Sequence, residues 1–128
     1  APAQAAGALL EVPLTVRASG LYRRAPWAYR VPLLRRAANS LSRGLAWLCP
    51  AESDLDTMLD VARQARAEGA THLQFMLHSS ELMPGGSPSF RDAADIERLY
   101  ERLEILFHEL SAWCVGATLE EFRAMARA

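Results

Sequence analysis

The sequence of 128 residues contains no lysine, and its fourteen basic residues, all arginine, are balanced by fifteen acidic ones. The resulting formal net charge of −1 excludes the strongly basic surface of a dedicated nucleic-acid binder or a polybasic membrane protein. No stretch approaches the roughly 18 consecutive apolar residues of a membrane-spanning helix. We therefore expect neither a nucleic-acid partner nor a membrane span.

Cysteine is also scarce, with only Cys49 and Cys114, each in an apolar setting. Two buried free thiols are favoured over a disulfide, because nothing marks the chain as secreted. Residues 1–7 lack the charged start and apolar centre of a signal peptide. We expect a bacterial cytoplasmic location, with residues 1–8 as a linker or cut end and residues 9–128 as a single α/β domain.

Motifs for metal or phosphate binding are missing as well. There is no glycine-rich phosphate loop followed by lysine, no metal-binding histidine pair and no cysteine cluster. On an extended segment, His72 and His78 would lie about 20 Å apart, too far to bind one ion. The sequence therefore predicts no metal-ligand set within this chain.

Several short apolar runs have the composition of β-strands. They are residues 9–16, 44–49 and 73–78, with 113–115 as a further candidate. The run at 73–78 is mainly apolar on both faces, which is typical of strands in a parallel sheet covered by helices. Pro13 removes a ladder donor and requires an edge, a bulge or a strand end.

Apolar residues at helical spacing alternate with these runs and predict helices over residues 31–42, 53–68, 92–110 and 118–127. Ser53 is the expected N-cap of the second helix and Gly69 its C-terminal stop. Thr118 and Glu121 have the spacing of a capping box. Strand–helix–strand units with short links are expected to be parallel and right-handed.

His78 ends the apolar run 73–78 and is followed by a long polar loop, residues 79–91. In α/β folds, chemistry is placed where strands end and such loops converge. Histidine suits a general acid, because it can be protonated near neutral pH and release that proton to a leaving amine. Glu81 can orient the imidazole or bind substrate, or can cap the loop by accepting backbone N–H bonds.

Residues 75–88, FMLHSSELMPGGSP, resemble the last conserved block of the polysaccharide deacetylase family, the NodB-homology relatives of the family 4 carbohydrate esterases. The resemblance runs from about Leu9 to Leu119 and covers the C-terminal half of the family. It implies the C-terminal portion of an irregular (β/α)7 barrel, with parallel strands alternating with helices. It also implies metal-dependent hydrolysis of N-acetyl or O-acetyl groups on a glycan, with His78 as general acid. The Ser-Ser-Glu after His78 departs from the usual pattern and marks a divergent branch.

The same resemblance implies a divalent, zinc-like metal bound by an aspartate and two histidines, beside an aspartate that serves as base. Those residues belong to the family's N-terminal half, to which this chain has no match. The expected partners are therefore a glycan substrate and the missing N-terminal half, or another chain completing the barrel. These 128 residues alone are expected to be inactive. The alternative is a non-catalytic α/β module that binds a glycan or a protein.

Two further residues are candidates for substrate binding. Glu11 belongs to a Glu-x-Pro block similar to one in the family, although an acid at a strand end is more often solvated or ion-paired. Trp27 lies in a segment of interleaved arginines and aromatic residues, 20–30, which can stack on and hydrogen-bond a sugar. A surface loop that covers one end of a sheet is the other interpretation of that segment.

Overall fold

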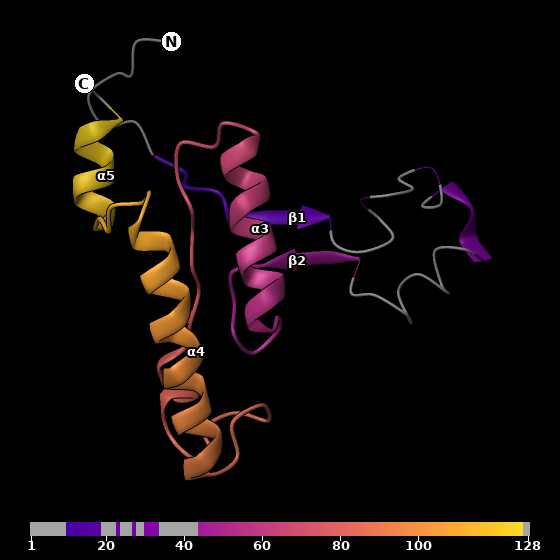
Figure 1. Ribbon diagram of the computed structural model, residues 1–128, viewed down its shortest axis with the longest axis vertical. Coiled ribbons are helices and arrows are strands. Elements are labelled where there is room, and N and C mark those ends of the chain that lie inside the picture. The colour runs from indigo at the N-terminus through magenta and orange to yellow at the C-terminus, as the bar shows by residue number, and fades with distance from the viewer. Residues whose placement is uncertain (1–9, 19–22, 24–26, 28–29, 34–43, 127–128) are drawn as a thin grey trace.

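The computed structural model describes residues 10–18, 23, 27, 30–33 and 44–126 of the chain. The elements, in order, are β1 (Val16–Ala18), β2 (Leu45–Trp47), α3 (Leu55–Ala67), the 3-10 helix η2 (Ser79–Leu82), α4 (Ala93–Ser111) and α5 (Leu119–Met125). Figure 1 shows α3 against the two strands, and an extended segment, residues 71–78, between α3 and α4. Most of the predicted helix 31–42 lies outside the described residues.

The predicted helix at 53–68 is confirmed as α3, with a different N-cap. The Asp54 carboxylate accepts the Thr57 N–H at 2.8 Å, which satisfies a free donor of the first turn. Ser53 instead donates its N–H to the Cys49 carbonyl at 2.9 Å and so belongs to the preceding turn. Gly69 follows the C-cap with φ of +75°, the left-handed conformation that ends many helices.

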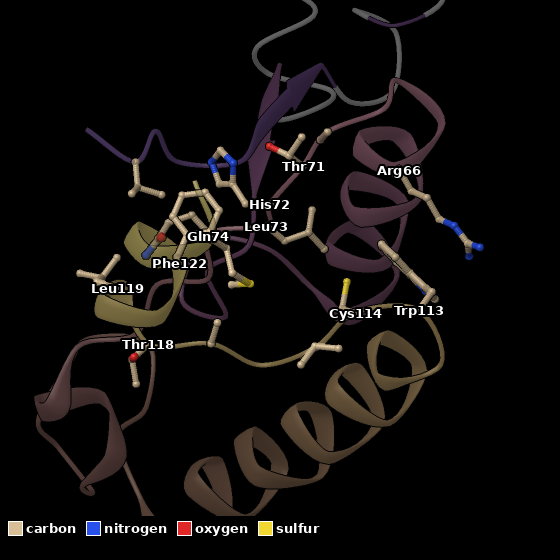
Figure 2. A pocket seen from close by; sticks show the side chains of 15 residues that line it. Arg66, Thr71, His72, Leu73, Gln74, Trp113, Cys114, Thr118, Leu119 and Phe122 are labelled. Atoms are coloured by element: carbon tan, nitrogen blue, oxygen red, sulfur yellow. The ribbon is translucent and has the colours of Figure 1, made fainter. Parts of the chain in front are cut away.

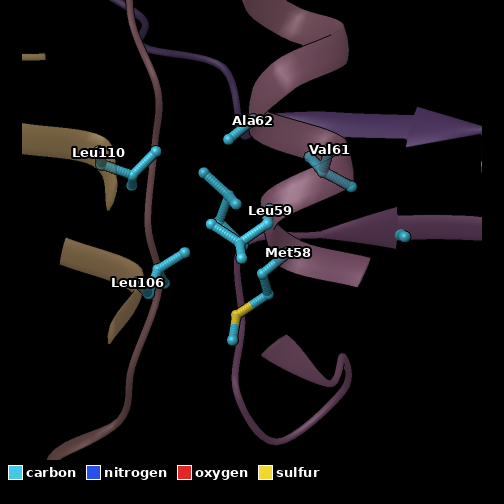
Figure 3. Packing of buried hydrophobic residues seen from close by; sticks show 8 residues of the cluster. Met58, Leu59, Val61, Ala62, Leu106 and Leu110 are labelled. Carbon is cyan, nitrogen blue, oxygen red and sulfur yellow. The ribbon is translucent and has the colours of Figure 1, made fainter. Parts of the chain in front are cut away.

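Helix α4 confirms the predicted helix at 92–110 and contributes to both apolar clusters of the core. Its C-terminal half packs with α3 and the end of β2 around a first cluster: Ala46, Leu48, Met58, Leu59, Val61, Ala62, Leu106 and Leu110. Figure 3 shows Met58 and Leu59 of α3 on the side that faces Leu106 and Leu110. Ile96, Leu99 and Leu103 of α4 pack with Phe90, from the preceding loop, in the second cluster. Tyr100 and Phe107 of α4 are about half exposed.

The sheet contradicts the barrel prediction. Strands β1 and β2 pair antiparallel, with Val16 opposite Trp47 and Ala18 opposite Leu45. The described residues contain no parallel pair, so the predicted C-terminal portion of a (β/α)7 barrel is wrong. One face of this ribbon carries Ala46 and packs on α3, while the opposite face leaves Val16 and Leu45 exposed.

The predicted strand at 73–78 is extended but unpaired, and hydrogen-bond chemistry explains why. Met76 donates its N–H to the Leu48 carbonyl at 2.9 Å, as one bond of a parallel ladder would require. The next bond of that ladder would come from residue 50, which is a proline and has no N–H. Gln74 donates to the Thr15 side chain at 2.8 Å instead of to a backbone carbonyl.

The predicted strand at 9–16 is wrong for its described part, residues 10–15, because pairing begins only at Val16, beyond Pro13, and β1 continues to Ala18. Residues 113–115, the last strand candidate, form an irregular link between α4 and α5. Helix α5 opens with the predicted capping box: Glu121 donates its N–H to Thr118 Oγ1 at 3.2 Å, and its carboxylate accepts the Thr118 N–H at 2.7 Å. Within the described ranges, no helix is both long and apolar enough to cross a membrane.

Candidate functional site

The loop after His78 begins with a reciprocal pair of hydrogen bonds. His78 donates its backbone N–H to Glu81 Oε2 at 3.2 Å, and Glu81 donates its N–H to the His78 carbonyl at 2.9 Å. These bonds close the single turn of η2. The His78 side chain is exposed at the start of this turn, so the imidazole is accessible to a ligand. The sequence placed His78 at the start of a polar loop, and the structure agrees on that position; its catalytic role stays a prediction.

Glu81 lies deeper than the sequence indicated, with only 5% of its surface exposed. Its carboxylate accepts the backbone N–H of His78, so it caps the turn, one of the two roles the sequence left open. Burial raises the pKa of the neighbouring Cys49 thiol, and the charge of Glu81 raises that pKa further. Cys49 is therefore a protonated thiol at neutral pH, beneath the loop.

The rest of the loop is folded back on itself by backbone contacts. Gly85 donates its N–H to the Phe90 carbonyl and Gly86 to the Met83 carbonyl, both at 3.0 Å. A Cβ at residue 86 would collide with the Ser80 carbonyl and the Met83 side chain. Gly86 thus allows a backbone approach that no other residue permits, and the loop has a defined shape.

A shallow cleft of about 390 Å³ lies where the loop meets α4. Its walls are formed by Ser89, Phe90, Asp95, Arg98, Glu101 and Arg102. Arg98 and Asp95 form an ion pair at 2.6 Å, and the Arg102 guanidinium lies 5.7 Å from the centre of the Phe90 ring. The buried Nε of Arg102 has no hydrogen-bond partner among the described residues. The cleft therefore offers positively charged hydrogen-bond donors from arginine and negatively charged acceptors from aspartate and glutamate, beside the apolar Phe90 ring.

The other two predicted site residues are not brought to His78. Glu11 is exposed and is followed by Val12, which lines a separate cavity together with His72. His72 and His78 are at opposite ends of the extended segment, so that cavity is remote from His78. Trp27 is 64% exposed, and no contact with the loop is recorded for it within the described ranges. The structure thus groups His78 with Glu81 only.

The described residues also lack a group of three histidine, cysteine, aspartate or glutamate side chains that could bind a metal ion. His72 Nε2 lies 3.2 Å from the Pro13 carbonyl, and the His72 ring packs against Phe122. His108 is exposed in the last turn of α4. A catalytic zinc needs three protein ligands, so the metal that the deacetylase resemblance implies stays a prediction whose ligands would come from outside the described residues.

Sequence reasoning missed the cleft beside the loop, because its residues come from two elements whose contact no local pattern predicts. The spacing of Arg98 and Arg102 on one helical face was the only available signal. A comparison of the chain with protein-family models, with curated proteins and with solved structures finds no match.

Proposed function

We propose that this chain is part of a metal-dependent glycan deacetylase and that His78 is its general acid. In the proposed reaction, water adds to the acetyl carbonyl of an N-acetylated sugar, and the carbon–nitrogen bond then breaks. His78 gives its proton to the departing nitrogen, so that acetate and a free amine are released. The metal would activate the water, and its ligands and the catalytic base would come from polypeptide outside these 128 residues.

The observation that carries this proposal is the exposed imidazole of His78 on a backbone turn fixed by Glu81. A general acid must reach the leaving group and must retain its position through the reaction. The similarity of residues 75–88 to a deacetylase block supplies the reaction class. The mixed polar cleft beside the same loop supports a glycan, because vicinal hydroxyls both donate and accept hydrogen bonds. Cytoplasmic location remains part of the proposal, and the free thiols Cys49 and Cys114 support it.

The test is acetate release from N-acetylated oligosaccharides by the full-length protein that contains this sequence. His78→Ala is expected to lower kcat by roughly 10²–10⁴-fold with little change in KM, because proton transfer stabilises the transition state rather than the bound substrate. His108→Ala, which removes another exposed imidazole from α4, is the matched control and should leave kcat unchanged. Normal turnover by the His78 variant would refute the catalytic role.

A non-catalytic glycan- or protein-binding module is the second candidate, because the polar cleft beside the loop suits binding without catalysis. The two functions differ in one measurement. A deacetylase converts the oligosaccharide, whereas a binding module retains it unchanged on a column of immobilised protein. In the second case His78→Ala would change the retention of the sugar but no rate.

A further inference from the structure

We propose that a second cavity, remote from His78, binds a small apolar carboxylate such as a medium-chain fatty acid. The cavity has a volume of about 470 Å³, within the range of about 300–1,000 Å³ that is usual for ligand sites. Four segments surround it. They are the C-terminal turn of α3, the chain at residues 70–74, the link at residues 113–118, and α5. This inference does not depend on the deacetylase proposal.

The walls of this cavity are mainly apolar. They comprise Val12, Leu73, Trp113, Val115, Leu119, Phe122 and Met125, together with smaller residues. Figure 2 shows Arg66 and Trp113 at one end, His72 and Phe122 at the other, and Leu73 and Cys114 between them. Burial raises the pKa of the Cys114 thiol, so this wall stays uncharged at neutral pH. An extended apolar chain matches such a lining.

Most polar groups in the lining already have partners inside the chain. His72 Nε2 lies 3.2 Å from the Pro13 carbonyl. Gln74 donates its backbone N–H to Thr15 Oγ1 at 2.8 Å and its side-chain Nε2–H to the Phe75 carbonyl at 3.4 Å. Thr118 Oγ1 is engaged in the capping box of α5. These groups are therefore committed to the fold and are not the main anchors for a ligand.

Arg66 is the exception. Its guanidinium lies 4.9 Å from the centre of the Trp113 ring, and no ion pair is recorded for it in the described part of the chain. The described lining contains Arg66 and no aspartate or glutamate. A cation at the rim of an apolar cavity without carboxylates selects a ligand with an apolar body and one negative end. This charge complementarity identifies the carboxylate class.

The binding test uses the intrinsic fluorescence of Trp113 in the purified protein, titrated with monomeric decanoate below its micelle concentration. We expect a saturable change, absent in Trp113→Phe, and binding weakened by roughly threefold to fourfold for each methylene removed from the acid. The neutral analogue decanol should bind several-fold more weakly than decanoate at low salt, and that difference should shrink as salt is added.

Variants of two arginines on the same helix isolate the charge at the cavity. Arg66→Gln should weaken decanoate roughly fivefold to tenfold and leave decanol unchanged. Arg63→Gln removes an equal charge from an exposed position of α3 that does not line the cavity, and should leave both ligands unchanged. Amide chemical shifts that move at Leu73 and Phe122 on adding decanoate would independently locate the ligand.

Three results would overturn the proposal. They are equal affinity for decanol and decanoate, equal losses in the two arginine variants, and shifts that lie away from Leu73 and Phe122. A last experiment replaces decanoate with vesicles that contain an anionic lipid. Binding to vesicles without binding to monomeric decanoate would mean that the surface meets a membrane and that no fatty-acid cavity exists.

Discussion

Glu81 and His78 exchange two hydrogen bonds, one from the His78 N–H to the buried Glu81 carboxylate and one from the Glu81 N–H to the His78 carbonyl. The Glu81 carboxylate therefore holds the backbone of His78, and not its imidazole, in place. In such an arrangement Glu81 is a positioning residue. Changes at Glu81 should act first on loop structure and only through it on chemistry.

Glu81→Ala is expected to lower the free energy of unfolding by about 1–3 kcal/mol, because the His78 N–H loses its acceptor in a partly buried site. Glu81→Gln keeps an amide oxygen in place and should lose less. Urea denaturation measures both values. Glu97→Gln, at an exposed position of α4, is the control and should change stability by less than about 0.5 kcal/mol. Equal stability of the alanine variant and the wild type would contradict the capping role.

Adjacent residues of α4 give a second comparison. Leu106 is fully buried in the first cluster, whereas Ile105 is 49% exposed. Leu106→Ala should cost about 2–5 kcal/mol, because it removes apolar contacts and leaves a cavity. Ile105→Ala should cost well under half as much in the same thermal unfolding experiment. A reversed order would show that α4 is rotated relative to this structure.

Glycine substitutions test the shape of the loop. Gly86→Ala places a Cβ against the Ser80 carbonyl, so the backbone must move and the bonds donated by Gly85 and Gly86 should weaken. Hydrogen exchange of these two amides is expected to accelerate. Gly116→Ala is the control, because open space surrounds that position. Unchanged exchange in the Gly86 variant would mean that the loop has another conformation.

Lowering the pH should break the hydrogen bonds that Asp95 and Glu121 accept at the starts of α4 and α5. The pKa of Asp95 is lowered mainly by the Arg91 N–H and further by Arg98, and that of Glu121 by the Thr118 N–H and hydroxyl. A lowered folded-state pKa adds stability above the unfolded values, about 3.9 for Asp and 4.3 for Glu, and that stability is lost as pH falls through the folded-state pKa. The Arg91 and Thr118 amide signals should therefore shift between roughly pH 4.5 and 2.

Variants of the acids provide the controls for this pH titration. Asp95→Asn should abolish the shift of the Arg91 amide, and Glu121→Gln should abolish that of the Thr118 amide. Glu120→Gln removes the same charge from the neighbouring position of α5 and should preserve both. Shifts that persist in the first two variants would assign the transition to other groups.

The exposed apolar residues of the β1–β2 ribbon predict self-association. Val16 and Leu45 are exposed there next to strand edges, a combination that favours pairing with another chain. Sedimentation should show species larger than a monomer at high protein concentration. Val16→Thr combined with Leu45→Thr should reduce them, whereas Ile105→Thr on α4 should not. A compact monomer at all concentrations would contradict this prediction.

Sequence predicted α3, α4 and α5 well, because helix signals are local. The spacing of apolar residues identified α3 and α4, and Thr118 with Glu121 identified the start of α5. Pairing between strands depends on distant residues, and there the prediction failed. Apolar composition at 73–78 indicated a buried parallel strand, but Pro50 lacks the donor that a ladder beside Leu48 requires.

The site was predicted in the same unequal way. His78 and its loop are contiguous, so the sequence and the family resemblance could propose them together, and their role stays a prediction. The burial of Glu81 depends on packing beneath the loop, and the cavity at Arg66 combines α3 with the chain beyond residue 112. No spacing rule relates such segments. Glu11 was favoured by family resemblance only. In the structure it lies near the end of the extended segment that is opposite His78.

Helix α4 spans both apolar clusters, and Phe75 packs against each of them. Neither end of the molecule can therefore open without loosening the other, and the described core should melt as one cooperative unit. A ligand bound beside Arg66 would then slow amide exchange at Phe90, at the far end of α4, with no direct contact between them. Energetic communication between the two ends is a property of one shared helix.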